Sequence, residues 1–519
     1  HGDEQEEGPI AFLSNSDYSK ETMRFGVSKV ADWGHIGASY AKNEGLYGIP
    51  FHQEAEGAHG HDEEHGDEHD EEHGDEHDEE HADDHGGHEE ERITATTESD
   101  IINLSGSLNV NGSFLRNIDY HFRDTDYTLT EAYVEKEDVQ EGEHGADHDE
   151  DEHANEGPTI FINDAQEFGA IFDVSTETFT QKIALEFVSE DVAIMGAEAF
   201  MNPTSTDEVT LGYYASRELD GFVFDFGIRN DWVDRSGSVS AEEEHHDEEA
   251  DQQFFNTQQS VTSYGLQISR QFSETVSATI NLASVERAPS AVELFMNGPH
   301  FATGRYEVGN PRLDTEKANS AELLLDYTSD TFFGSFSIFT NDINNYIYLR
   351  DETEEEHEEH ADDHGGLISA NYLQQDAEFV GYEFEIGGVF SVAGGDLTLS
   401  YGLDSVSADF SDNSNVPRIN PDRSIYTAAY SRGSLGASLV LKDIEAQADI
   451  AANEEMTAGY TMLNMNITNV FTLSNDIDLT VSVFGRNLMD EIARNHSSFV
   501  KEEVPLPGRS YGLKFYATF

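Results

Sequence analysis

Hydrophobic and polar positions alternate along much of this chain with a period of two residues. From residue 511 to 519 the odd-numbered positions are Tyr, Leu, Phe, Ala and Phe, and the even-numbered ones are Gly, Lys, Tyr and Thr. Successive side chains of a β-strand point to opposite faces, so this pattern predicts a strand with two unlike faces. The same alternation recurs at 381–386, 463–468 and 477–483. The chain is therefore predicted to be all-β.

The predicted strands are joined alternately by short turns and by long connections. Turns rich in Gly, Asp, Asn and Ser lie at 31–34, 218–221, 329–330, 392–395, 432–433 and 474–476. Long connections are predicted near 43–92, 126–156, 200–207, 233–253, 288–317, 341–368, 408–421, 446–459 and 488–508. This alternation is typical of an outer-membrane β-barrel, whose tight turns face the periplasm and whose long loops lie outside. A soluble β-sandwich array or propeller with acidic insertions would also give alternating strands. Strands of about ten residues, 11% aromatic content and a terminal Phe519 favour the transmembrane antiparallel barrel.

The strand count indicates that the sequence begins inside a larger barrel. Nine hairpins and a final strand make about 19 strands, whereas single-chain bacterial barrels have an even number. We therefore expect further strands before residue 1. The first residues, HGDEQEE, do not resemble a secretory leader, which is basic and then apolar.

Composition excludes several classes of protein. The 519 residues include 106 Asp and Glu against 27 Lys and Arg, which gives a formal net charge of −79. A chain this acidic repels a phosphate backbone, so no nucleic-acid partner is expected. The absence of cysteine excludes disulfides, Cys-ligated metal sites and a thiol nucleophile. The sequence has no run of about 18 apolar residues, so no helical membrane span is predicted.

Most histidines lie in four acidic segments, 54–91, 137–156, 242–251 and 351–364. These 82 residues contain 46 carboxylates, 17 of the 23 histidines and no Lys or Arg. The octapeptide HGDEHDEE is repeated from residues 65 and 73, and the string EEHADDHGG occurs at both 79–87 and 358–366. Like-charged blocks without apolar residues cannot form a core, so we expect solvated insertions into one barrel domain spanning 1–519.

Carboxylates and imidazoles together suit borderline divalent cations, with Zn²⁺ first and Ni²⁺, Cu²⁺ or Mn²⁺ after it. The repeats do not define a single ligand set, so many weak and exchangeable sites are predicted. Solvation alone is the other interpretation of the acidic runs, but it does not account for histidine at every fourth position. The candidate ligands in these segments are His65, His69, His73, His77, His81, His85, His144, His148, His153, His245, His246, His357, His360 and His364.

Two stretches resemble the TonB-dependent outer-membrane receptors, and more specifically their zinc-receptor branch. The first, starting at residue 286, reads ERAPSAVELFMNGPHFATGRYEVGNPRLDTE, and the second, at 485–519, contains GRNLMD, ARNHSSFVK and PLPGR. The resemblance implies a 22-stranded barrel with an N-terminal plug and import driven by the inner-membrane TonB complex. In this sequence we find no plug, no TonB-contacting segment and about three strands fewer than the 22 that the resemblance implies. We expect a fragment rather than a barrel with a separately supplied plug.

The resemblance also suggests a tighter site near the barrel mouth. His300 lies outside the His-rich runs, in the string that matches the family, and should join an acid from an earlier loop and ligands from the plug. Glu156 is the acid we choose, while His121 and His52 are weaker candidates that also fit ordinary wall or loop positions. His496 is expected to be structural.

The sequence contains no GxSxG, HExxH or phosphate-loop motif, so no enzyme is expected and no cofactor is needed. It predicts a monomeric zinc importer in the outer-membrane lipid of a Gram-negative bacterium. One alternative is a receptor of the same fold for another metal or a metal chelate. Another is a passive pore or a surface protein that sequesters metal without energised import.

Overall fold

The computed structural model describes residues 15–50, 92–133, 157–196, 198–240, 252–353, 356, 366–452, 454–474 and 477–518. These residues form one sheet of 21 strands. Its first ten strands are β1 (Tyr18–Ala31), β2 (Gly34–Gly48), β3 (Ile93–Asn109), β4 (Asn117–Tyr133), β5 (Thr159–Asp173), β6 (Thr180–Met195), β7 (Thr204–Leu219), β8 (Phe222–Ser240), β9 (Gln252–Gln271) and β10 (Val276–Arg287). The others are β11 (Asn297–His300), β12 (Arg305–Val308), β13 (Glu316–Thr328), β14 (Phe332–Asp351), β15 (Ile368–Val392), β16 (Gly395–Phe410), β17 (Arg423–Arg432), β18 (Leu435–Ile444), β19 (Tyr460–Ser474), β20 (Ile477–Arg486) and β21 (Ser510–Thr518).

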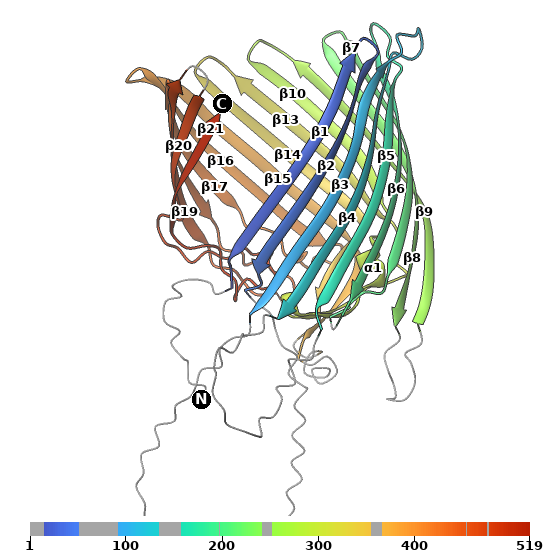
Figure 1. Cartoon of the computed structure of the whole chain (residues 1–519). Coiled ribbons are helices and arrows are strands. Elements are labelled where there is room, and N and C mark those ends of the chain that lie inside the picture. Colours follow the sequence, from blue (N-terminus) through green and yellow to red (C-terminus); the bar gives the residue numbers. More distant parts are fainter. Residues whose placement is uncertain are drawn as a thin grey trace, which may run out of the picture.

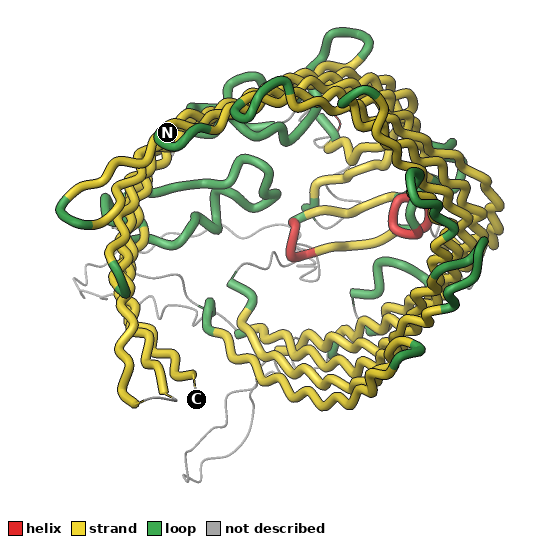
Figure 2. Tube along the Cα trace, turned by 90° about the horizontal axis from the view of Figure 1, so that it is seen from above, coloured by secondary structure: helices red, strands yellow, loops and turns green. Residues whose placement is uncertain are grey.

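The 19 long strands form the wall of a barrel, in agreement with the number predicted from the sequence. Each pairs antiparallel with the next, and β10 pairs with β13 because β11 and β12 leave the wall. Figure 1 shows these tilted strands around a cylinder, and Figure 2 shows the two short strands and the helices inside the ring. Among the described residues, β1 pairs only with β2 and β21 only with β20, so these two strands are the edges of the sheet.

Large apolar side chains on the outer face explain why these sequences form a wall. Phe168 on β5 and Phe187 on β6 are each about half exposed, and their ring centroids lie 6.3 Å apart. Their sequence neighbours Glu167 and Glu186 point to the other side of the sheet. An apolar outer surface with a polar inner face is the pattern of a barrel that faces lipid. No helix among the described residues has the length and hydropathy needed to cross a bilayer.

The strands extend past the apolar band on the side of the long connections. On β8 the exposed Phe226, Ile228 and Trp232 are followed by mostly polar residues from Asp234 to Ser240. The predicted loop boundaries near 43, 126, 233 and 341 are therefore wrong by six to eleven residues. Within Asp234–Ser240 the positions are buried or half-buried and both faces carry polar side chains, so this sequence lacks the alternation that marks a strand.

All nine short connections lie at one end of the wall and all nine long ones at the other, because every wall strand is antiparallel to its neighbours. The four His/acid segments follow β2, β4, β8 and β14, which all end at the same rim. Nearly all their residues lie outside the described part of the chain. The exceptions correct the expectation that the segments are solvated throughout: Asp351 ends β14, and Glu352 is buried and accepts a hydrogen bond from the Ser369 amide at 2.7 Å.

The connection from β10 to β13 folds inward and forms a small core at this rim. It contains helix α1 (Ala291–Phe295), the hairpin β11–β12 and the 3-10 helix η2 (Phe301–Thr303). A capping box begins α1, since the Ser290 hydroxyl accepts from the Glu293 amide and the Glu293 carboxylate accepts from the Ser290 amide. Buried Leu294 and Phe295 pack with Phe200 and other apolar residues of the mouth. The sequence predicted only a long loop here, because a four-residue strand with Gly and Pro shows no periodicity.

Candidate metal-binding residues at the mouth and on the inner wall

Arg287 at the end of β10 fixes the inward-folded segment to the wall. Its guanidinium donates two hydrogen bonds to Glu293 at 2.9 and 3.0 Å and two to Glu316 at 3.0 Å. Paired donors in the plane of a guanidinium match a carboxylate on each side. Arg287 and Glu293 of the RAPSAVEL string and Glu316 of the GNPRLDTE string are therefore joined in one structural clamp.

His300 lies in the β11–β12 hairpin and pairs with an acid that the sequence analysis did not identify. Its Nδ1 is 2.9 Å from Oε1 of Glu307, and Glu307 is only 4% exposed. The imidazole stacks on Phe200 at 4.9 Å between centroids, while the Thr303 hydroxyl lies 3.2 Å from the same Glu307 oxygen. A carboxylate that accepts from one imidazole nitrogen orients the other nitrogen toward a ligand.

The position of Glu307 follows from the hairpin register. His300 faces Arg305, and Gly298 faces Glu307, so His300 and Glu307 lie diagonally on neighbouring strands. An acid seven residues after a candidate histidine, with Gly304 between them, was the available signal. It could not be used without recognising the hairpin.

Beside this pair, a cavity of about 920 Å³ is lined by charged side chains of the long connections. Arg305 and Arg418 both contact Asp351, at 2.7 and 3.1 Å, and both guanidinium carbons lie over the ring of Phe499, at 4.3 and 3.9 Å. Burial lowers the pKa of Arg418, although Asp351 opposes that shift. The cavity therefore combines fixed positive and negative groups at the mouth of the barrel.

His496, expected to be structural, is buried at the edge of this cavity. Its Nδ1 is 2.8 Å from the Thr457 hydroxyl, and its Nε2 is 3.1 Å from Oε1 of Glu454. Burial raises the pKa of Glu454, but His496 and the amides of Ala451 and Arg418 outweigh it, so the pKa lies below its usual range. These contacts connect three separate loops.

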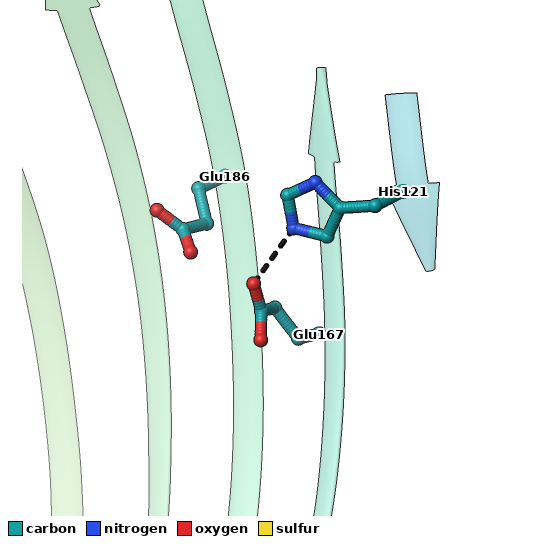
Figure 3. Close-up of side chains that lie close together, drawn as sticks. All are labelled: His121, Glu167 and Glu186. Atoms are coloured by element: carbon teal, nitrogen blue, oxygen red, sulfur yellow. Dashed lines mark hydrogen bonds and ion pairs between the residues drawn. The ribbon is translucent and has the colours of Figure 1, made fainter. Parts of the chain in front are cut away.

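His121 lies on the wall, on β4, and not in a loop. Its Nε2 is 2.7 Å from Glu167 on β5, and Glu186 on β6 is close to both, as Figure 3 shows. The three ligand atoms lie within 4.8 Å of one another, which among the described residues makes this the one group of three His or acidic side chains placed to share a metal ion. His121 was predicted from the sequence as a candidate ligand, but neither carboxylate was.

The remaining predicted ligands lie outside the described residues. They comprise His52, Glu156 and all fourteen histidines named in the four His/acid segments. The predicted partnership of His300 with Glu156 therefore remains a prediction, and Glu307 is the acid that contacts His300 in the described part of the chain.

Comparison with known proteins gives the family. Residues 53–488 match the model of the TonB dependent receptor-like β-barrel, which spans most of the chain. The chain belongs to the TonB-dependent receptors. Members of this family are transporters of the Gram-negative outer membrane rather than enzymes, and the barrel described above is therefore a membrane-spanning one.

Solved structures of several transporters and receptors share the fold at low sequence identity. The copper transporter OprC aligns with a TM-score of 0.70 and 12% identity, over 97% of this chain and 72% of its own. The FrpB iron transporter of Neisseria meningitidis (F3-3 variant) aligns with a TM-score of 0.62 and 13% identity, over 96% of this chain and 72% of its own. The ferric-catecholate import receptor Fiu of E. coli K12 aligns with a TM-score of 0.58 and 12% identity, over 97% of this chain and 75% of its own. Their ligands differ, so this likeness indicates the fold alone.

Proposed function

We propose that this receptor imports zinc and that its four His/acid segments collect the ion before it enters the barrel. The observation that carries this proposal is the common rim: strands β2, β4, β8 and β14 all end on the side of the long connections. In an outer-membrane barrel that side faces the medium. Seventeen histidines and 46 carboxylates would then meet the ion on one surface.

The ligand types support zinc over softer or harder ions. Imidazole and carboxylate bind Zn²⁺ at about 2.0–2.2 Å, and no cysteine is present to favour thiolate chemistry. The dense negative charge attracts divalent cations over a distance set by ionic strength, which raises their local concentration before any ligand binds. Many weak sites release the ion readily, as a collector requires.

His300 and Glu307 are the proposed handover point at the mouth. Glu307 orients the imidazole, and the hairpin that carries both is fixed to the wall through Arg305 and Asp351. A half-site of this kind needs further ligands to become tight. Glu156 and residues of a plug are the proposed additional ligands, and the plug would also contact the TonB complex.

Competition binding on a shortened protein tests the choice of metal. Residues 54–91 and 357–364 are removed, while Asp351, Glu352 and Glu356 are kept because each is bonded to the described part of the chain. Zn²⁺ should saturate a residual site at the mouth, and His300→Asn should lower the number of bound Zn²⁺ ions by one. Saturation by another ion alone would overturn zinc as the cargo.

A receptor for another metal or metal chelate is the second candidate. The likeness to OprC and FrpB, a copper and an iron transporter, and the mixed charge of the mouth cavity favour it. In that case the acidic segments would act as buffers. A passive pore is the third, and it predicts zinc entry that persists when the proton gradient feeding TonB is collapsed.

A further inference from the structure

Three adjacent wall strands place a histidine and two glutamates around one glycine. His121 on β4 is opposite Gly169 on β5, and Gly169 is in turn opposite Glu186 on β6. Glu167 lies two residues before Gly169 on the same face of β5. Figure 3 shows the three side chains converging on one another.

The separations suit a metal ion after small side-chain movements. His121 Nε2 and Glu167 Oε1 are 2.7 Å apart, and all three ligand atoms lie within 4.8 Å of each other. Tetrahedral Zn²⁺ with bonds of about 2.0–2.2 Å needs ligand atoms roughly 3.3 Å apart. The long Glu186 side chain can close the remaining distance by rotation, whereas the strand pairing fixes the three backbone positions.

Gly169 provides the space in which the imidazole lies. A Cβ at this position would be 2.2 Å from His121 Cε1 and 2.7 Å from Nε2, and no other side chain comes as close to it. A glycine inside a strand commonly marks such a close approach. The ring therefore occupies the space that a side chain at 169 would need, and any such side chain would displace it away from the two carboxylates.

The cluster lies on the inner face and well below the mouth. Its residues alternate with Phe168 and Phe187 of the outer apolar band, so they face the interior at the level of the membrane. Twelve residues of β4 separate His121 from Tyr133 at the rim, which is about 40 Å along the strand. His300 lies at that rim, where the strands before the four His/acid segments also end, so this cluster is separate from the site proposed there.

We propose that His121, Glu167 and Glu186 form a second divalent-cation site on the inner wall, where an ion released from the mouth can bind during its passage. This role rests on the proposed zinc import, but the binding itself does not. Three protein ligands leave one position of a tetrahedral ion open to water, which is the arrangement of an exchangeable site rather than a closed structural one.

Modification of histidines in the folded full-length protein tests the site residue by residue. Diethyl pyrocarbonate reacts with accessible imidazoles, and peptide mass spectrometry gives the rate at His121 with Zn²⁺ or with a chelator. Zn²⁺ should slow the reaction at His121 at least fivefold. The rate at His35, an exposed histidine on β2, should not change.

Two variants separate metal binding from the His121–Glu167 pair. Glu186→Gln and Gly169→Ala should each reduce the zinc protection of His121 to less than twofold, with barrel folding checked by heat-modifiable gel mobility. Unchanged protection in Glu186→Gln, or no protection in the unaltered protein, would overturn the site. If His121 is unreactive even without zinc, anomalous scattering at the zinc edge decides, and no peak among the three side chains counts against the proposal.

The same experiment distinguishes this site from the proposed collector. Protection of His65 to His85 with none at His121 would remove the wall site and leave the collector. Protection at His121 with none in the four His/acid segments would remove the collector and leave the wall site.

Discussion

Arg305 and Asp351, 46 residues apart, form a two-bond ion pair that joins the inward hairpin to the end of β14. The bonds are 2.9 and 2.7 Å long, and the side chains are 8% and 12% exposed. Arg418 reaches the same carboxylate from another loop. Asp351 is also the first residue of a segment that the sequence marks as acidic and His-rich, so that segment begins at a fixed point.

Asp351→Asn should release the hairpin from the wall. Removing one partner of a buried ion pair costs about 3–5 kcal/mol, since it leaves the other charge buried and uncompensated. Hydrogen exchange should show this as faster exchange of the β12 amides. The matched control is Asp17→Asn, which removes a solvent-exposed pair with Arg92 and should leave exchange unchanged. Unchanged β12 amides in Asp351→Asn would show that the pair does not hold the hairpin.

Phe295→Ala should destabilise the small core at the mouth. The side chain is 1% exposed, and its ring occupies the space beside Gly237 on β8. Truncating a buried phenylalanine costs about 3–5 kcal/mol through lost burial and the cavity that remains. Urea unfolding monitored at this rim measures the change. Phe254→Ala, at a position 77% exposed, is the control and should have little effect.

Acid should loosen the loops around His496. The pKa of Glu454 is lower in the folded protein than its usual value of 4.5, so its stabilising contribution is present above that value and is lost as the pH falls through the folded pKa. Hydrogen exchange of residues 445–459 between pH 6 and 3 should show this loss. Glu454→Gln should flatten the profile relative to the unaltered protein. The same dependence of exchange on pH in Glu454→Gln and in the unaltered protein would contradict the role of Glu454.

Zinc binding by the four His/acid segments should weaken with both protons and salt. Protons compete for imidazoles whose reference pKa is about 6.5, and salt screens the long-range attraction. Calorimetric titration should give fewer bound ions at pH 5.5 than at pH 7.5, and lower apparent affinity at 1 M than at 0.1 M NaCl. Replacing all 17 histidines of the four segments with glutamine should remove most of the pH effect and keep the salt effect.

The wall could be predicted from the sequence because half of each strand faces lipid and half faces the interior. That contrast gave the strand number and the alternation of short and long connections. It fails in the polar extensions, such as Asp234–Ser240, where both faces carry polar side chains at buried or half-buried positions. It fails also at the inward hairpin, whose β12 pairs in parallel with β15, a contact that no local pattern indicates.

The candidate sites were predicted only in part for a related reason. Histidines stand out in a sequence, and His300 and His121 were both named from it. Their carboxylate partners Glu307, Glu167 and Glu186 are common residues whose importance depends on strand register. Register links residues 46 and 65 positions apart on the wall, and a single sequence does not reveal it.

The polar extension of the wall determines how far from the membrane the His/acid segments are attached. Seven residues of β8 continue beyond the apolar band, which at the usual tilt raises the rim by about 18 Å above the lipid. The Debye length in physiological salt is about 8 Å, so headgroup phosphates are screened at that height. The proposed collector, attached at this rim, would therefore not be repelled by a negatively charged membrane.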